Sequence, residues 1–323
     1  MPPLPKFAYF KGRLVPYEQA KVGVLTHALN YGTGVFGGLR GYWNADEQQL
    51  FVFRPLDHLK RFLESGRLLN MDLGITPATM ATAIKELLLA EGYREDCYVR
   101  PLAFYGDEGI GVRCHDLTPT LSIVAVPFGK YLENEEGVHA TFSSWRRLDD
   151  NSIPPRGKIA GAYVNSALAK TDALRAGFDE AIVLNQSGHI CEGSAENFFL
   201  VRNGVVATPP LTESILEGIT RRTVIELLRD VLGLTVVERT IDRTELYLAD
   251  EAFFTGTGVQ IAVITRVDHR LIGTGRIGAV GSQIRRLYFD AVRGKIARYR
   301  HWCVPVYDVP AKTAARQEQM VIA

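Results

Sequence analysis

Two segments of the chain hold residue types that could do chemistry together. Segment 153–163 contains Lys158 followed closely by Tyr163, and segment 190–199 contains Glu192 on a predicted strand. A lysine amine forms a Schiff base with an aldehyde, and an acidic group can keep a pyridine nitrogen protonated so that the ring accepts a carbanion's electrons. These are two requirements of pyridoxal phosphate (PLP) chemistry. A single lysine is a weak signal, because most lysines are solvated surface charges.

Three features could hold a phosphate dianion. Residues 217–222 lead into a predicted helix, whose first backbone amides would point at an anion. Residues 255–258 read Thr-Gly-Thr-Gly after an apolar strand, and glycines there permit a turn whose amides converge. Arg61 lies on a predicted helix with an apolar opposite face. Each feature also has an ordinary explanation, namely a helix cap, a simple turn and a solvated arginine.

Tyr98 and Arg100 alternate along a predicted strand, so their side chains face the same way. A hydroxyl beside a guanidinium could receive the carboxylate of a substrate. The alternative is a polar, outward-facing edge strand, with which Pro101 is consistent. Without a partner motif, the residues alone favour the edge strand.

The composition is that of an ordinary globular protein of 323 residues with a formal net charge of +1. This balance suggests neither a nucleic-acid nor a membrane partner. The four cysteines form no CxxC pair and the seven histidines no helical metal-ligand spacing, so we expect reduced thiols and no metal. The sequence shows neither a secretory signal nor an apolar stretch long enough to cross a bilayer, and we expect a cytoplasmic protein.

The order of predicted elements favours an α+β fold rather than regular βαβ winding. Turn signals, caps and apolar periodicity predict helices at about 59–63, 76–92, 165–175, 220–232 and 282–292. They predict strands at 7–10, 13–15, 40–43, 49–53, 97–104, 120–126, 180–184, 197–202, 205–207, 235–239, 251–254 and 259–267. A polar stretch with Gly and Pro at its edges predicts domains at 1–126 and 138–305, a connecting loop at 127–137 and a tail at 306–323.

In combination, the motifs resemble those of branched-chain amino-acid aminotransferases, which are fold-type IV (class IV) PLP enzymes. The resemblance runs from about residue 5 to residue 300. It rests on segments 27–36, 98–101, 109–112, 143–145, 192–197, 218–221, 247–251 and 255–257, together with Lys158 and Tyr163. It implies a small N-terminal α/β domain, a larger C-terminal domain with a pseudo-barrel sheet, and PLP at the interface between them.

The resemblance also implies roles for individual residues. Lys158 would bind PLP covalently and move the proton between Cα and C4′. Tyr163 would contact the ring oxygen and Glu192 the pyridine nitrogen. Phosphate binding would fall to Arg61, Gly218, Ile219, Thr220 and Thr257. The substrate would contact Tyr98, Arg100, Gly258, Phe36, Tyr31, Val112 and Tyr131, some of these from the neighbouring subunit of a homodimer or higher homo-oligomer.

Arg100 has a physical reason to lie at such a pocket, since one pocket must accept an apolar side chain and the carboxylate of glutamate in turn. Two departures from the family's pattern concern substrate range. Gly37 replaces a usual glutamate and Gly258 a common alanine, and both are expected to remove bulk near the pocket.

The expected activity is transfer of amino groups between Leu, Ile or Val and 2-oxoglutarate. The main alternative is a D-amino-acid or (R)-amine transaminase of the same fold. Two others are an aminodeoxychorismate lyase, which would release pyruvate, and a protein that binds the cofactor without turnover. Retention of both Lys158 and Glu192 disfavours the last.

Overall fold

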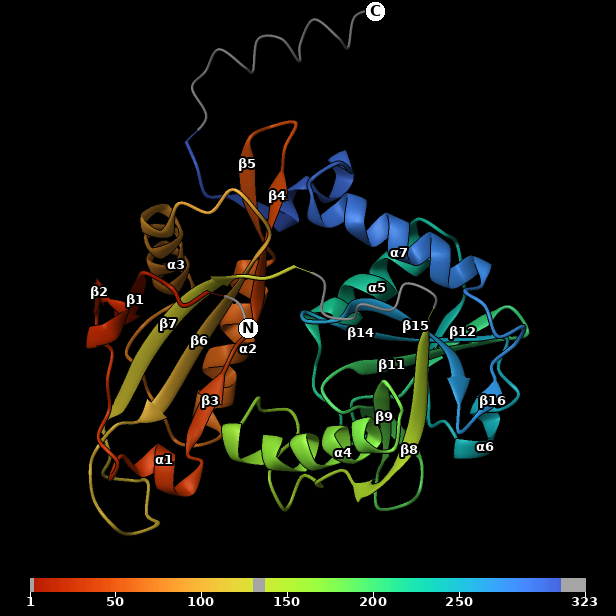
Figure 1. Ribbon diagram of the computed structural model, residues 1–323, viewed down its shortest axis with the longest axis horizontal. Helices are drawn as coiled ribbons and strands as arrows, with labels where there is room; N and C mark the ends of the chain where they lie inside the picture. Colours follow the sequence, from red (N-terminus) through yellow and green to blue (C-terminus); the bar gives the residue numbers. More distant parts are fainter. Residues whose placement is uncertain (1–2, 130–136, 309–323) are drawn as a thin grey trace, which may run out of the picture.

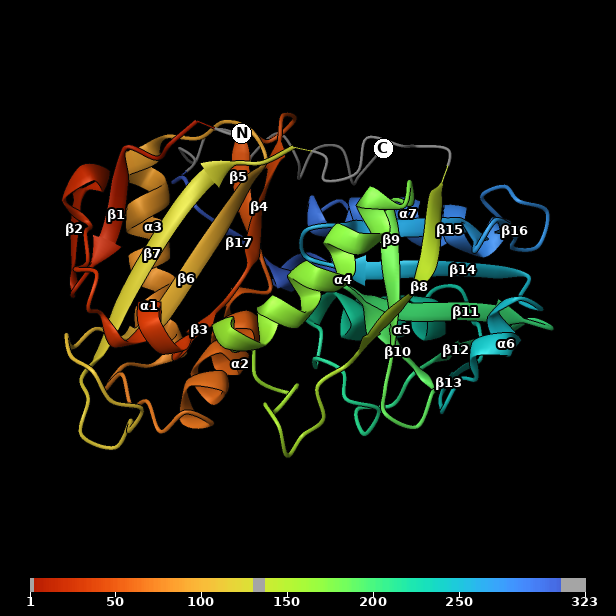
Figure 2. The same ribbon diagram turned by 60° about the horizontal axis from the view of Figure 1, so that its bottom comes forward.

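Two β-sheets lie side by side, and helices cover their outer faces (Figures 1 and 2). The computed structural model describes residues 3–129 and 137–308. In the first sheet the strand order is β17-β5-β4-β6-β7-β1-β2, with β3 paired to β6. Its strands are β1 (Phe7–Phe10), β2 (Arg13–Pro16), β3 (Gly34–Phe36), β4 (Leu39–Asn44), β5 (Gln49–Phe53), β6 (Cys97–Tyr105), β7 (Pro119–Pro127) and β17 (Cys303–Pro305).

The second sheet curls into a barrel. Its order is β10-β9-β8-β15-β14-β11-β12-β13, and an additional pairing of β10 with β11 closes six strands into a ring. The strands are β8 (Val138–Arg146), β9 (Glu180–Leu184), β10 (Ile190–Gly193), β11 (Asn197–Arg202), β12 (Val205–Thr208), β13 (Val236–Glu238), β14 (Glu251–Gly256), β15 (Gln260–Val267) and β16 (Arg270–Leu271). This closed sheet confirms the predicted fold class.

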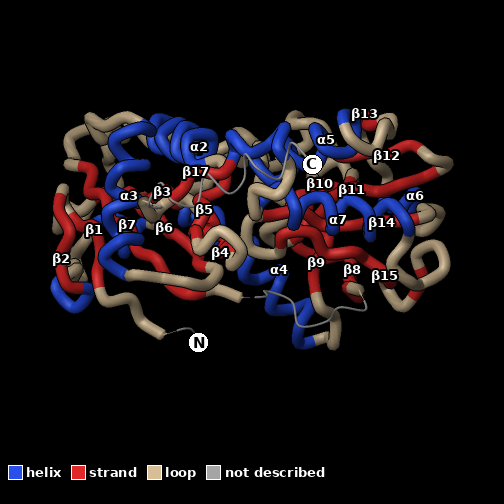
Figure 3. The backbone as a smooth tube through the Cα atoms, turned by 90° about the horizontal axis from the view of Figure 1, so that it is seen from above, coloured by secondary structure: helices blue, strands red, loops and turns tan. Residues whose placement is uncertain are grey.

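Helices flank both sheets, with α2 and α3 on the first and α5 and α7 on the second (Figure 3). Their bounds are α1 (His27–Tyr31), α2 (Pro55–Arg67), α3 (Pro77–Glu91), α4 (Tyr163–Arg175), α5 (Ile219–Asp230), α6 (Arg243–Leu246) and α7 (Ala279–Val292). Short 3₁₀ turns occur at Tyr17–Gln19, Ala160–Ala162 and Ala297–Trp302. The predicted limits of α3 are confirmed, because the Thr76 side chain accepts a hydrogen bond from the Thr79 amide and Gly92 takes the left-handed conformation at the end.

Strands of the barrel are buried on both faces. In β11, Phe198 lies in the core inside the barrel, whereas Phe199 lies in the core beneath α5 and α7. That outer core also contains Tyr42 and Phe53 of the first sheet. The two halves of the molecule are therefore joined by shared apolar packing as well as by the connecting segment.

Two predictions from sequence need correction. β8 has no predicted counterpart, because polar residues interrupt its apolar pattern (VHATFSSWR). β6 is a central strand paired with β7 on one side and with β3 and β4 on the other, so it is not an edge. Pro101 is tolerated there because pairing with β4 stops at Val99 and pairing with β3 begins at Leu102.

The last described strand, β17, joins the first sheet. β17 pairs antiparallel with β5, and Cys303 lies opposite Phe53. Over the described parts of the chain, the helices are too short or too polar to traverse a lipid bilayer.

Candidate active site

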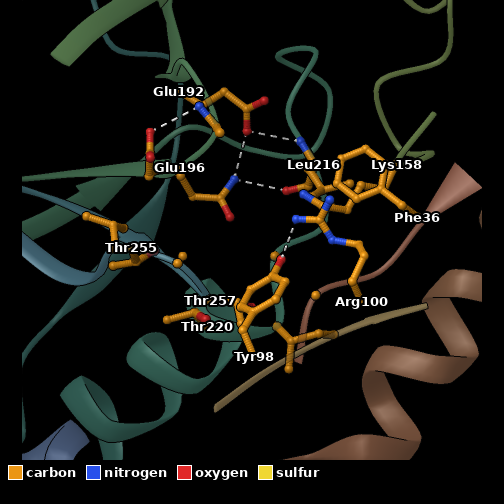
Figure 4. A pocket seen from close by; sticks show the side chains of 18 of the residues that line it. Phe36, Tyr98, Arg100, Lys158, Glu192, Glu196, Leu216, Thr220, Thr255 and Thr257 are labelled. Atoms are coloured by element: carbon orange, nitrogen blue, oxygen red, sulfur yellow. Dashed lines mark hydrogen bonds between the residues drawn. The ribbon is translucent and has the colours of Figure 1, made fainter. Parts of the chain in front are cut away.

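A cavity of about 400 Å³ lies between the two sheets. Most residues that the sequence analysis selected line it, and they come from distant parts of the chain (Figure 4). The selected residues at this cavity are Phe36, Arg61, Tyr98, Arg100, Lys158, Tyr163, Glu192, Gly218, Ile219, Thr220, Thr257 and Gly258.

Lys158 lies just before the turn that begins α4. Its Nζ is 2.6 Å from the hydroxyl of Tyr163 and 5.0 Å from the centre of the Phe36 ring. Burial, and next the nearby Arg61 guanidinium, lower the pKa of Lys158 to about 8. Burial raises the pKa of the Tyr163 hydroxyl to about 12, so this hydroxyl stays protonated. The amine is thus poised to lose and regain a proton near neutral pH.

Glu192 lies on β10 and is buried. One carboxylate oxygen is 2.6 Å from the Arg147 guanidinium, and the other accepts hydrogen bonds from the Asn197 side chain and the Leu216 amide. Burial raises the pKa of Glu192, while the charge of Arg147 opposes that rise. A paired, hydrogen-bonded carboxylate of this kind can face a cationic ring nitrogen across the cavity.

Glu196 is a second buried acid in the cavity wall. Its carboxylate accepts the Ala195 amide at 3.0 Å, and burial, followed by the charge of Glu180, raises its pKa. Burial without a cationic partner at hydrogen-bond distance, within residues 3–129 and 137–308, favours the uncharged form of Glu196, whereas the Arg147 guanidinium favours the charged form of Glu192.

A candidate anion site lies where Arg61 of α2 meets the start of α5. α5 begins at Ile219, and its N-cap residue, Gly218, has no side chain with which to cap the first amides. Arg61 of α2 reaches this end and donates to the Glu217 carbonyl at 3.0 Å. Uncapped amides at the start of a 12-residue helix, beside a guanidinium, provide the donors and positive potential that a phosphate requires.

Tyr98 and Arg100 of β6 also line the cavity. Arg100 donates to the Tyr98 hydroxyl at 3.1 Å, and its guanidinium stacks over Phe36 at 4.7 Å. Arg100 is exposed at the rim, whereas Tyr98 is half-buried. This side-by-side arrangement agrees with the alternation predicted from sequence.

The 257–258 turn is held from behind by Arg40, a buried residue of β4. Its guanidinium donates to the carbonyls of Thr257 and Gly258 at 2.9 and 3.0 Å, and to those of Phe128 and Gly129 at 3.1 and 2.9 Å. Among the described residues, no carboxylate pairs with this guanidinium. Because the carbonyls of Thr257 and Gly258 point at Arg40, these hydrogen bonds orient the peptide groups of the 257–258 turn.

Some selected residues lie elsewhere. Tyr31 and Val112 are outside the cavity and exposed to solvent, although the Tyr31 hydroxyl accepts the Gly111 amide at 3.0 Å. Tyr131 lies outside the described residues. Gly37 is not at the cavity: an added Cβ would lie 2.7 Å from Cγ of Pro101, so the expectation that this glycine enlarges the pocket is wrong.

Sequence reasoning missed Arg147 and Arg40. Arg147 lies two residues after motif segment 143–145, and Arg40 lies two residues after Gly38; these positions are the only signals that the sequence offers. In the part of the chain that the structure describes, histidine, cysteine and carboxylate side chains form no group able to hold a metal ion.

Comparison with known proteins supplies the family. Residues 34–267 match the family described as Amino-transferase class IV. A protein of Aquifex aeolicus named "Probable branched-chain-amino-acid aminotransferase" is 48% identical, covering 94% of this chain and 97% of its own. The "Branched-chain-amino-acid aminotransferase" of Pseudomonas aeruginosa is 39% identical, covering 91% and 95%.

Solved structures agree. The branched-chain aminotransferase of Thermoproteus uzoniensis with norvaline superposes with a TM-score of 0.90 at 44% identity, covering 94% of this chain and 100% of that one. The branched-chain amino acid aminotransferase of Thermobaculum terrenum in its PLP-form gives 0.90 at 39% identity, covering 94% and 99%. On these grounds the chain belongs to the class IV aminotransferases.

Proposed function

We propose that this protein is a PLP-dependent aminotransferase that exchanges amino groups between Leu, Ile or Val and 2-oxoglutarate. The observation that carries the proposal is the presence of Lys158, Glu192 and Arg61 in the lining of one cavity. The similar proteins named above support the choice of branched-chain substrates. None of them favours the D-amino-acid alternative.

The residues present fit PLP. Lys158 would hold its aldehyde end, Glu192 its ring nitrogen and Tyr163 its ring oxygen. Arg61 and the first amides of α5 would hold its phosphate, together with Gly218, Ile219, Thr220 and Thr257. When bound, PLP supplies the electron sink that stabilises negative charge at the substrate Cα.

The chain's own groups would handle the proton. Lys158 has an amine pKa of about 8 and hydrogen-bonds to Tyr163, so it can remove a proton from the substrate Cα and return one nearby. Tyr163, protonated throughout the neutral range, would keep the amine oriented. The Arg147–Glu192 pair would keep a negative charge in place at the far end of the cavity.

Substrate orientation would depend on Tyr98 and on the amides of Thr257 and Gly258, which together can receive the α-carboxylate. Arg40 supports that turn from behind. Phe36 would contact an apolar side chain, and Arg100 at the rim would receive the second carboxylate of glutamate. One pocket could then serve both half-reactions without burying an unpaired charge.

We also propose that the chain forms a homodimer or larger homo-oligomer. The 109–112 loop exposes Ile110 (90%) and Val112 (78%), and Val24, Leu25 and Leu29 are exposed apolar residues of the adjoining α1 region. An apolar patch of this kind marks an interaction surface. A second copy bound there would cover it and could place Tyr31 and Val112 at the neighbouring cavity.

The domain boundary proposed from sequence between 1–126 and 138–305 is supported by the change from one sheet to the other between β7 and β8, although β17 at the end of the second range pairs with the first sheet. Phe128, near the start of the proposed connecting segment 127–137, lines the cavity. A cytoplasmic location is proposed because the four cysteines are free.

Initial rates test the proposal. PLP-loaded protein is expected to react with L-leucine and 2-oxoglutarate much faster than with D-alanine and pyruvate. Lys158→Ala should abolish transfer, and Glu192→Gln should slow it strongly while leaving the protein folded. A clear preference for D-alanine, or full activity of Lys158→Ala, would contradict the assignment.

A further inference from the structure

Ser65 connects two parts of the site without contacting the cavity itself. It lies on α2, one helical turn after Arg61, and its side chain is 1% exposed. The hydroxyl donates to the Arg61 carbonyl at 2.9 Å and accepts the Lys158 backbone amide at 3.1 Å. A hydroxyl has one proton to donate, so the Lys158 amide must be the donor in the second bond.

The backbone of Lys158 has unusual support. β8 ends at Arg146 and the turn before α4 begins at Ala160, so Lys158 lies in neither a helix nor a strand of its own half. Its carbonyl accepts the Phe36 amide of β3 at 3.0 Å, and the next residue, Ile159, bridges Val35. The peptide groups on both sides of the lysine are therefore held by the N-terminal half of the molecule.

The Ser65 hydroxyl links the backbone of Arg61 to the backbone of Lys158. The same hydroxyl binds the carbonyl of Arg61, proposed to hold the phosphate, and the amide of Lys158, proposed to hold the opposite end of PLP. Misplacement of a reacting group by about 1 Å can lower a rate about 100-fold. A single buried hydroxyl thus relates the two attachment points.

We propose that Ser65 is a positioning residue for Lys158, which fixes the lysine relative to the phosphate end of the site. This inference rests on the proposed function. Loss of the hydroxyl would leave the buried Lys158 amide without its acceptor and free the 153–158 segment to shift. The α-carboxylate site at Tyr98 and the 257–258 turn would be unaffected, because it belongs to other elements.

The test compares Ser65→Ala with Thr223→Ala in the PLP-loaded enzyme. Thr223 of α5 is a matched control: it is buried, donates to the Ile219 carbonyl at 2.9 Å and accepts from Arg54 at 3.0 Å. The readouts are the pH midpoint of the visible absorption change, the dissociation constant for PLP, and kcat and KM for L-leucine. The first two do not depend on turnover.

For Ser65→Ala we expect the pH midpoint to shift by at least about half a unit and kcat to fall about 10-fold or more, while KM for L-leucine changes less than about twofold. Ser65→Thr keeps the hydroxyl and should restore the midpoint. Thr223→Ala should lose comparable stability without moving it. If Ser65→Ala does not fold, Ser65→Cys, whose thiol is a weak hydrogen-bonding group, is expected to give the same changes.

Two results would overturn the inference. The first is an unchanged pH midpoint and kcat in Ser65→Ala, or in Ser65→Cys where only that variant folds. The second is a midpoint shift in Thr223→Ala equal to that in Ser65→Ala. Either could occur while Lys158→Ala still abolishes transamination, and the proposed function would then stand. Activity of Lys158→Ala, or failure of the protein to bind PLP, would instead remove the proposed function itself.

Discussion

Gly38 leaves room for the hydroxyl of Tyr98, and its replacement by alanine isolates the role of that hydroxyl. A Cβ at this position would lie 2.0 Å from the Tyr98 hydroxyl oxygen and 2.8 Å from the adjoining ring carbon. Ordinary contacts begin near 3.4 Å, so the hydroxyl must move by more than 1 Å. Because the tyrosine can tilt away, we expect the Gly38→Ala protein to fold, with a stability loss near the lower end of about 1 to 3 kcal/mol.

The displaced hydroxyl would lose its 3.1 Å hydrogen bond with Arg100 and its place in the proposed α-carboxylate site. A hydrogen bond to a charged group contributes about 1.5 to 3 kcal/mol, which corresponds to a roughly 10- to 150-fold fall in kcat/KM. The assay is kcat/KM for L-leucine with saturating 2-oxoglutarate.

Tyr98→Phe provides the control, because it removes the hydroxyl without adding bulk. In the double variant Gly38→Ala/Tyr98→Phe the two losses in kcat/KM should be clearly less than additive, since the hydroxyl that both changes act on is already absent, although the ring carbon at 2.8 Å must still shift. Fully additive losses, or a Gly38→Ala enzyme with normal kcat/KM, would contradict this role of the Tyr98 hydroxyl.

Three further predictions concern Lys158, Arg40 and Thr76. In cofactor-free protein the pKa of Lys158 is about 8 in the folded chain and 10.5 in the unfolded chain, so between these pH values the unfolded chain binds more protons. The free energy of unfolding should therefore rise by about 3 kcal/mol from pH 8 to pH 10.5, relative to Lys158→Met, as measured by urea unfolding. Arg40→Met leaves four carbonyls without their donor and should raise KM for both substrates about 10- to 100-fold. Arg40→Lys should not restore a normal KM, because an ammonium lacks the guanidinium fork. A normal KM in either variant would show that Arg40 does not orient the 257–258 turn. Thr76→Ala should cost about 1 kcal/mol by removing the cap of α3, with activity unchanged in the same rate assay.

The sequence was informative where chemistry imposes a local pattern. The cap at Thr76, the helix that begins near Gly218 and the alternation of Tyr98 with Arg100 could all be predicted, since each depends on residues a few positions apart. The chemistry of Lys158 with Glu192 also follows from residue type.

Contacts between distant segments could not be predicted in this way. Arg147 pairs with Glu192, Arg40 holds the 257–258 turn, and Ser65 holds the Lys158 amide. Arg147, Arg40 and Ser65 are isolated polar residues that belong to no recognisable sequence spacing. β8 was missed because its residues alternate imperfectly. A side chain at position 37 would likewise point at Pro101, which is more than sixty residues away in sequence.

Lys158 is proposed to bind PLP covalently in the cavity that it shares with Glu192. Borohydride reduction of the PLP-loaded protein, followed by peptide mass mapping, identifies the lysine that carries the cofactor. We expect loss of the visible absorption band and a single phosphopyridoxyl label on Lys158. A label on another lysine, or no stable label at all, would show that Lys158 does not hold the cofactor.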